Sequence, residues 1–348
     1  TMGGADKRKP PAGDAAGRTS ARVKTEKGAA PVRDEEGGGG GGAAGAAAPP
    51  PAVASSKRVE AHVNPARVRA APGTLAGFDP STPPPAGKPV IYWMSRDQRV
   101  ADNWALLYAA QQVRMCGEGG ERERDGRPSL ALSKPPSSFL PHPHHFQAAA
   151  AGAPLAVAFN LVPAFLGAGA RQFGFMLRGL QAVAADLAGA GIPFFLLRGD
   201  PGETVPALAA SSSAGLVVAD VSPLRLSRAW RAAVAAGCGA AGVPLAEVDA
   251  HNVVPVWGPA TDKKEIGART LRPRLHRCLP DFLTEFPSLP AVKPWGTAHP
   301  PPAIDWPAVI AEATSAGAAV PEVTWCVPGE AAASAALADL PDEAPALP

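Results

Sequence analysis

The fold is decided by residues 90–108, which read Val-Ile-Tyr-Trp-Met-Ser-Arg-Asp-Gln-Arg-Val-Ala-Asp-Asn-Trp-Ala-Leu-Leu-Tyr. The first five of these residues are apolar and rich in β-formers, as expected for a strand that is buried on both faces. A turn with four charged side chains follows, and it leads into an amphipathic helix for which Asp102 is the expected N-cap. Ligands of open α/β sheets bind where a strand ends and its helix begins, so this charged turn is a candidate binding site.

From residue 88 onward, short apolar runs alternate with amphipathic segments. The apolar runs predict five strands, at residues 90–94, 155–159, 193–197, 216–219 and 243–248. The amphipathic segments predict helices over residues 102–115, along an apolar stripe from 173 to 187, from about Glu203, and over 224–236. Such alternation with short connections predicts an α/β fold with a doubly wound, five-stranded parallel sheet covered by helices.

The remaining segments are poor in large apolar side chains. Residues 1–63 are mostly Gly, Ala, Pro and charged residues, which bury too little surface to offset the entropy of ordering, so we expect a disordered, low-complexity tail. Residues 64–88 are a lead-in to the α/β domain, which spans 89–257. Within it, residues 117–154 carry no sustained pattern and predict a disordered insertion. Residues 258–348 predict an irregular connecting segment.

The composition narrows the function classes. A net charge of +2 implies no strong polyanion affinity for the chain as a whole. The four cysteines are scattered without metal-ligand spacing, as in a reducing compartment, and no apolar stretch approaches the ~20 residues of a membrane span. The basic residues 7–10 predict nuclear import, with a chloroplast or other organelle as the alternative. Acidic residues in the tail argue against a transit peptide. We expect a monomer.

Residues 92–109, YWMSRDQRVADNWALLYA, closely resemble the opening strand, turn and helix of class II cyclobutane pyrimidine dimer photolyases. The core from Arg96 to Leu106 resembles the signature of the wider photolyase/cryptochrome family. The resemblance runs from about residue 64 to about residue 330, broken by the predicted insertion. Further motifs similar to class II follow in the same order, at residues 64–69, 170–180, 193–197, 220–225, 247–257, 268–272 and 279–283.

The resemblance implies light-dependent DNA repair, in which cyclobutane pyrimidine dimers of UV-damaged DNA are reversed. In that family, FAD sits in a helical domain that follows the α/β domain. We expect this helical domain to be missing here, with residues 258–348 as an interdomain connector truncated before it. This chain alone would then bind no FAD and repair nothing. It would supply an antenna and docking domain, whose partners are DNA and the helical domain.

The resemblance also implies an antenna chromophore, a deazaflavin or a folate, near the carboxyl end of the first strand. The residues expected against it are Trp93, Met94, Ser95, Arg96, Arg99 and Asp220. A competing interpretation makes Arg96, Asp97, Arg99 and Asp102 a buried ion network that holds the turn or docks the absent domain.

A second basic group lies further along the chain, at Arg269, Arg272, Arg274 and Arg277. These arginines suit contact with DNA phosphates or docking to the helical domain. Docking is the favoured interpretation, and Pro273 is expected to interrupt their helix.

Other candidate residues predict no chemistry. Asp249, His251 and Asn252 form an acid-base trio without a nucleophile pattern, so we expect a structural role for His251. The histidines in residues 142–145 are expected to be solvated, and no metal site is predicted. Two functional alternatives remain open. One is an inactive photolyase-like module that binds a ligand or a partner, and the other is a cryptochrome-type photoreceptor, which the class II wording at residues 93–95 disfavours.

Overall fold

The computed structural model describes residues 62–122, 152–258, 267–296, 299–315 and 320–339. The chain divides into two units, residues 1–56 and 57–348, and every described residue belongs to the second. The predicted tail, the import signal and most of the predicted insertion therefore lie outside the described residues.

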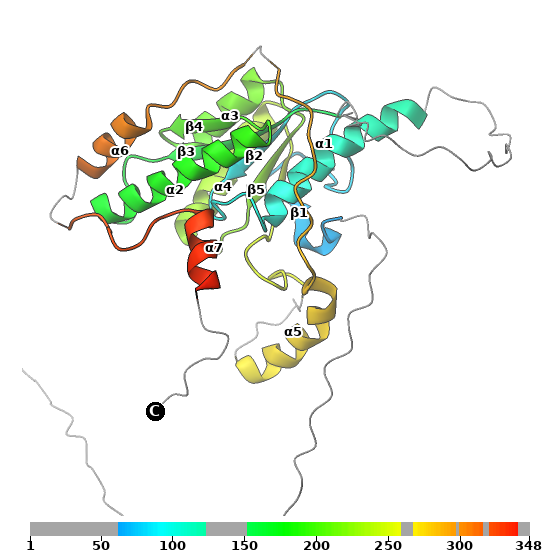
Figure 1. Ribbon diagram of the computed structural model, residues 1–348. Helices are drawn as coiled ribbons and strands as arrows, with labels where there is room; N and C mark the ends of the chain where they lie inside the picture. Colours follow the sequence, from blue (N-terminus) through cyan, green and yellow to red (C-terminus); the bar gives the residue numbers. More distant parts are fainter. Residues whose placement is uncertain (1–61, 123–151, 259–266, 297–298, 316–319, 340–348) are drawn as a thin grey trace, which may run out of the picture. The chain divides into compact units, whose positions relative to one another are not determined.

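A six-stranded sheet forms the centre of the second unit, with the strand order β1-β6-β5-β2-β3-β4 (Figure 1). Neighbouring strands from β6 to β4 run parallel, which confirms the predicted doubly wound parallel sheet. These five parallel strands are β2 (Val90–Met94), β3 (Leu155–Leu161), β4 (Phe194–Arg198), β5 (Leu216–Asp220) and β6 (Leu245–Val248).

The sheet also has a sixth strand at its edge, so the predicted count of five is wrong. β1 (Val68–Ala70) follows the short 3-10 helix η1 (Pro65–Arg67) and runs antiparallel to β6, with Val68 opposite Val248. Its three residues have a charged one in the middle, and they join the sheet through backbone pairing with β6 and through the Arg69–Glu247 ion pair. Because such a segment has no apolar run or alternation to detect, the pattern predicted only a lead-in.

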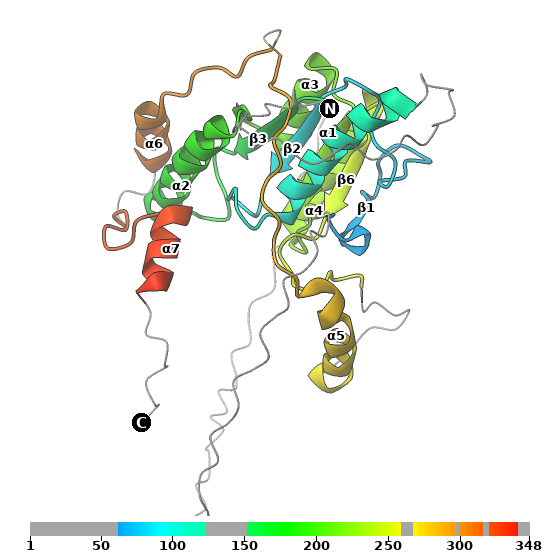
Figure 2. The ribbon, with the colours of Figure 1, turned by 45° about the vertical axis from the view of Figure 1, so that its right-hand side comes forward.

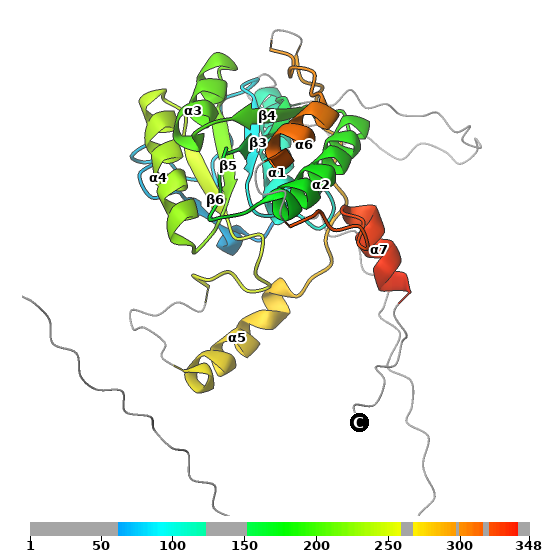
Figure 3. The ribbon, with the colours of Figure 1, turned by 90° about the vertical axis from the view of Figure 1, so that its left-hand side faces the viewer.

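Four helices cover the two faces of the sheet, as the alternating side chains of β2 demand. Val90, Tyr92 and Met94 pack against one layer of helices, and Ile91 and Trp93 pack against the other. Figure 3 shows α3 and α4 on one side of the sheet and α2 on the other. The first layer consists of α1 (Trp104–Arg122) and α2 (Ala170–Gly189), and the second of α3 (Pro201–Ser211) and α4 (Arg225–Ala240).

Helix α1 is longer than predicted, because residues 117–122 continue it instead of opening the insertion. Those residues are Gly, Glu and Arg, so they add no apolar stripe that a periodicity argument could detect. The helix therefore begins one residue after Asn103 and runs a full turn and more beyond its last predicted residue.

The C-terminal segment contains three helices. A helix around the arginines of residues 269–277 was predicted, but the two later helices lie where an irregular segment was predicted, so that prediction is wrong there. α6 and α7 both pack on α2 (Figure 2). The pattern missed them because each is short and rich in Ala, with few large apolar side chains to mark a stripe. In α5, Pro273 lies inside the helix and does not interrupt it as predicted. As a proline it has no N–H to donate to the preceding turn. The three helices are α5 (Ala268–Phe282), α6 (Trp306–Ser315) and α7 (Glu330–Ala338).

Candidate functional site

In the turn between β2 and α1, the residue that caps the N-terminus of α1 is Asn103 and not Asp102. The Asn103 Oδ1 atom accepts hydrogen bonds from the N–H groups of Ala105 and Leu106, at 3.0 Å each. Asp102 has a φ of 50°, in the left-handed region, whereas an N-cap residue needs extended backbone. Its carboxylate instead pairs with Arg99 at 2.9 Å. The predicted cap is therefore wrong by one residue.

Asp220, at the carboxyl end of β5, binds the backbone of this turn through its side chain. Its buried carboxylate accepts hydrogen bonds from the N–H groups of Ser95, Arg96 and Asp97, at 2.9, 2.7 and 3.3 Å. It also accepts a hydrogen bond of 2.7 Å from the Tyr92 hydroxyl. Burial raises the pKa of Asp220, while its hydrogen bonds from Arg96, Ser95 and Tyr92 oppose that rise.

Three successive N–H groups on one carboxylate form the kind of nest that binds anions in other proteins. Here the nest lies between β2 and β5, where the strand order reverses and open α/β sheets usually bind their ligands. The carboxylate of Asp220 already occupies it. These N–H groups are thus not available to an external anion, and the role of Asp220 is to hold the turn in place.

A pocket of about 500 Å³ opens beside this turn, at the carboxyl ends of β2 and β3. We call it the aromatic pocket. Its volume lies in the range of small-molecule sites, and no charged side chain lines it. The lining residues are Trp93, Met94, Ser95, Gln98, Phe159, Asn160, Val162, Phe165, Gly167, Ala168, Gln172, Phe173, Met176, Pro201 and Trp230.

One polar atom in the lining of the aromatic pocket lacks a partner. The indole N–H of Trp93 is buried and has no hydrogen-bond acceptor among the described residues. The amide of Asn160 is satisfied, because it donates to the Gly199 carbonyl at 2.6 Å and accepts from the Thr204 hydroxyl. A buried unpaired donor costs ~1–3 kcal/mol.

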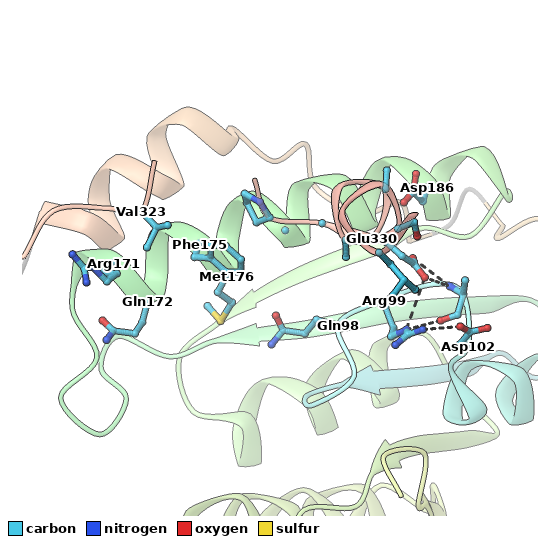
Figure 4. Close-up of a pocket in the computed structure, with 18 residues that line it drawn as sticks. Gln98, Arg99, Asp102, Arg171, Gln172, Phe175, Met176, Asp186, Val323 and Glu330 are labelled. Atoms are coloured by element: carbon cyan, nitrogen blue, oxygen red, sulfur yellow. Dashed lines mark hydrogen bonds and ion pairs between the residues drawn. The ribbon is translucent and has the colours of Figure 1, made fainter. Parts of the chain in front are cut away.

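A larger groove of about 1030 Å³ adjoins the aromatic pocket, between the turn, α2 and α7 (Figure 4). Gln98, Gln172 and Met176 line both spaces. In the groove, Arg99 lies 3.8 Å from the carboxylate of Glu330. That carboxylate also accepts hydrogen bonds from the N–H groups of residues 100 and 101, at 3.2 and 3.0 Å. Glu330 thus fastens α7 to the turn.

The predicted antenna residues therefore separate into three groups. Trp93, Met94 and Ser95 line the aromatic pocket, and Arg99 lines the adjoining groove. Arg96 lines neither, because its guanidinium donates to the Val221 carbonyl at 3.2 Å. Asp220 also lines neither. Sequence reasoning missed the aromatic contributions of residues 159–176 and of Trp230, which come from other strands and helices.

The four charges of the turn do not form one buried network. Arg99 and Asp102 pair in an exposed position, with side chains 44% and 51% exposed. Asp97 instead contacts His251, whose Nδ1 lies 3.0 Å from the Asp97 Oδ1 atom. His251 therefore makes the structural contact that was expected of it. In the same loop, the Asp249 carboxylate accepts hydrogen bonds from Asn252 and from the N–H of residue 256.

Arg67 is a buried charge that sequence reasoning left without a role. Its guanidinium donates to the carbonyls of Asp249, Asn252, Val253 and Phe282, at 3.2, 2.8, 2.7 and 3.3 Å. Desolvation lowers the pKa of Arg67, and the charge of Asp249 opposes this effect. The guanidinium joins the lead-in to the loop after β6 and to the end of α5. The lone Arg of the Asn-Pro-Ala-Arg stretch at 64–67 was the available signal.

The arginines predicted to contact DNA or a further domain lie on α5. Arg269, Arg272 and Arg277 are exposed, and Arg274 is partly buried. At about 100° per residue, Arg269 and Arg272 lie about 60° apart around the helix, whereas Arg274 lies about 140° from Arg269. They share a helix and do not form one stripe. Their role remains a prediction.

Two absences hold for the described part of the chain. No helix in it is long and apolar enough to cross a membrane. The same residues contain no cluster of three or more potential metal ligands among His, Cys, Asp and Glu. These residues thus define an α/β domain whose candidate site is an aromatic pocket without charged side chains, lined by one residue with an unpaired buried donor, Trp93.

Comparison with known proteins gives this domain its family. Residues 142–292 match the family model for DNA photolyase. A deoxyribodipyrimidine photo-lyase of Oryza sativa subsp. japonica is 44% identical over 255 residues, covering 72% of this chain and 43% of the relative. Its counterpart in Arabidopsis thaliana is 40% identical over 243 residues, covering 70% and 42%. The one in Potorous tridactylus is 39% identical over 241 residues, covering 69% and 38%.

A solved structure also matches, that of a bacterial class III photolyase from Agrobacterium tumefaciens. Its TM-score is 0.40 at 16% identity, covering 65% of this chain and 38% of that one. The chain carries a domain of the DNA photolyase family. It spans about two fifths of the length of the curated relatives named above.

Proposed function

We propose that the chain supplies the chromophore-binding α/β domain of a class II enzyme that reverses cyclobutane pyrimidine dimers in DNA with light. The names of the relatives support the reaction, and the motif in residues 92–109 supports the class. The observation that carries this domain's share of the function is the aromatic pocket.

The lining of the aromatic pocket favours a flat, uncharged ring system. Phe165, Phe173 and Trp230 offer aromatic faces or edges, which pack well against planar heterocycles. The unpaired indole N–H of Trp93 suits a ring carbonyl or ring nitrogen as acceptor. When bound, such a chromophore would collect light and pass the excitation onward.

These features favour a deazaflavin over a folate. A deazaflavin ring carries carbonyl acceptors and fits a pocket without charged side chains. A folate carries glutamate carboxylates, which would have to reach Arg99 or Arg171 in the adjoining groove.

FAD does not fit the described residues. The N–H nest that the described residues form at the switch point is filled by the Asp220 carboxylate, so the pyrophosphate of a dinucleotide has no place in it. FAD is therefore assigned to residues outside this domain. The arginines of α5, led by Arg269 and Arg272, are proposed to contact that further domain, with DNA as the second choice.

The test is reconstitution of the whole 348-residue chain with a deazaflavin or with a folate. After gel filtration, absorption in the near-ultraviolet to blue range and fluorescence report what the protein retains. Wild-type chain should retain the deazaflavin. Trp93→Phe keeps an aromatic ring but removes the N–H, so it should weaken binding about five- to tenfold. Ala168→Phe fills the pocket and should abolish binding.

Trp325→Phe is the matched control, because Trp325 is 86% exposed and lies outside the aromatic pocket. It should bind as the wild type does. A folded wild-type chain that releases both compounds would overturn the chromophore role. Retention of folate that depends on Arg99 would keep the role and change the ligand.

A further inference from the structure

Four arginines gather where α4 meets the edge strand β1, around one buried carboxylate. Arg69 on β1 pairs with Glu247 on β6 at 2.8 Å, and Arg231 on α4 pairs with the other oxygen of the same carboxylate. Glu247 is fully buried and Arg231 is 8% exposed. Arg225 and Arg228 precede Arg231 by two turns and one turn, and both are exposed.

The cluster carries more positive charge than its carboxylate can balance. Among the described residues, neither Arg225 nor Arg228 has a carboxylate partner. Burial lowers the pKa of Arg231, and the charges of Arg69 and Arg228 lower it further against the attraction of Glu247. The side chains thus repel one another, and a bound anion would relieve that repulsion.

A pocket of about 320 Å³ lies among these side chains, lined by Pro72, Arg225, Arg228, Ala229, Arg231 and Ala232. We call it the arginine pocket. Its lining includes no aromatic residue on which a base could stack and no acidic residue that would repel an anion. Successive arginines at three-residue spacing rise about 4.5 Å along α4. The pocket suits small oxyanions held by guanidinium groups.

We propose that the arginine pocket binds a phosphate group. The overall charge of +2 conceals this site, because the acidic residues that balance the chain lie elsewhere. The phosphate comes from the backbone of duplex DNA or from a small phosphorylated molecule, and the same chemistry recognises both. This site is separate from the aromatic pocket, since the two share no lining residue.

The test uses the full chain and the variant Arg225→Gln/Arg228→Gln. Both side chains are exposed and unpaired with carboxylates, so this variant should fold as the wild type does. Arg231 is left in place, because removing it would leave Glu247 buried without that partner. The charge-matched control is Arg114→Gln/Arg198→Gln, which removes two exposed arginines outside the arginine pocket. The probes are a fluorescein-labelled DNA duplex, damaged or undamaged, followed by anisotropy, and pyrophosphate followed by calorimetry.

A contact with the DNA backbone predicts a specific salt dependence. Each phosphate contact contributes about 0.9 to the slope of log K against log salt. The two arginines hold one phosphate, so the double variant should lose about 0.9 from that slope and at least about tenfold in affinity near 0.1 M salt. Damaged and undamaged duplexes should lose equally, because the contact reads no base. The control should bind as the wild type does.

The other outcomes decide the source or reject the site. Pyrophosphate binding that the double variant alone loses, with duplex binding unchanged, assigns the pocket to a small phosphorylated molecule. If neither probe distinguishes the double variant from the control, or the wild type binds neither, the phosphate site is wrong. These outcomes are independent of chromophore retention, which reports on the aromatic pocket alone.

Discussion

Replacing Arg67 by Ala removes the side chain that joins the lead-in, the loop after β6 and the end of α5. Four backbone carbonyls would lose the same donor at once. The guanidinium also lies 4.9 Å from the ring of Trp104 and 5.1 Å from that of Phe282. Arg67 itself is buried, at 1% exposed, so its charge is largely withdrawn from water in the intact protein.

The magnitude follows from the geometry of the contacts. Two of the hydrogen bonds, at 2.7 and 2.8 Å, are short enough for the ~1.5–3 kcal/mol expected of a charged donor. The two at 3.2 and 3.3 Å contribute less. The cost of burying the charge, which the lowered pKa of Arg67 reflects, offsets part of the gain. We expect a net loss of about 3 kcal/mol in the free energy of unfolding.

Urea unfolding followed by Trp fluorescence measures this loss, and hydrogen exchange locates it. Protection should fall in residues 249–256 and in α5, while the amides of β2, β3 and β5 keep their order of protection. Arg67→Lys should recover less than half of the loss, because a single ammonium group cannot donate to all four carbonyls as the planar guanidinium does.

The control is Arg198→Ala, which breaks an exposed ion pair with Glu312, 47% and 68% exposed. It should change the free energy of unfolding by less than about 1 kcal/mol. If Arg67→Ala costs no more than this control, the carbonyls are satisfied without Arg67 and the reasoning fails.

Three further predictions concern the turn and the pocket. Trp93→Phe should change the free energy of unfolding by less than about 1.5 kcal/mol in thermal scans, because the N–H it removes has no partner to lose; a larger loss would mean that the indole is bonded. The raised pKa of Asp220 means that the folded chain holds this proton above the usual 3.8 of the unfolded chain. Its contribution to stability is therefore present at low pH and falls as pH rises through its raised pKa. When urea midpoints are measured against pH, Asp220→Asn should remove this fall. An unchanged pH profile in the variant would contradict the prediction. Glu330→Gln weakens the attachment of α7 to the turn. Proteolysis after residue 320 should therefore become several-fold faster, while the free energy of global unfolding changes by less than about 1 kcal/mol. Equal cleavage rates in the variant and the wild type would contradict the attachment.

The parallel sheet was predictable because its strands are buried on both faces. Every residue of β2, β3, β5 and β6 is buried, and apart from Asn160, Asp220 and Glu247 these residues are apolar, so the strands stand out as apolar runs. β1 was not predictable, since its pairing depends on backbone groups and on Glu247, which lies far away in sequence. A strand that forms only because a distant strand pairs with it shows no apolar run or alternation in its own sequence.

The candidate site was predictable only where one strand supplies it. Trp93, Met94 and Ser95 end β2, and their place at the sheet edge follows from the strand alone. The rest of the aromatic pocket comes from residues brought there by the packing of α2 and α4, such as Phe173 and Trp230. The choice of Asn103 over Asp102 as cap also depends on the backbone path of the turn, which two adjacent polar residues do not reveal.

The closed switch point connects these observations. An open α/β sheet offers two ways to hold a ligand at its carboxyl edge: N–H groups for a phosphate, or side chains for a ring. In this chain the Asp220 carboxylate has taken the N–H groups, and the opening beside them is aromatic and without charge. The edge is therefore suited to a ring held by contact with aromatic and apolar side chains. Unbalanced positive charge collects instead in the arginine pocket on α4. A dinucleotide site combines ring binding with phosphate binding. In this chain the aromatic pocket is suited to a ring and the arginine pocket to a phosphate, so a ligand of the aromatic pocket needs no phosphate to bind there.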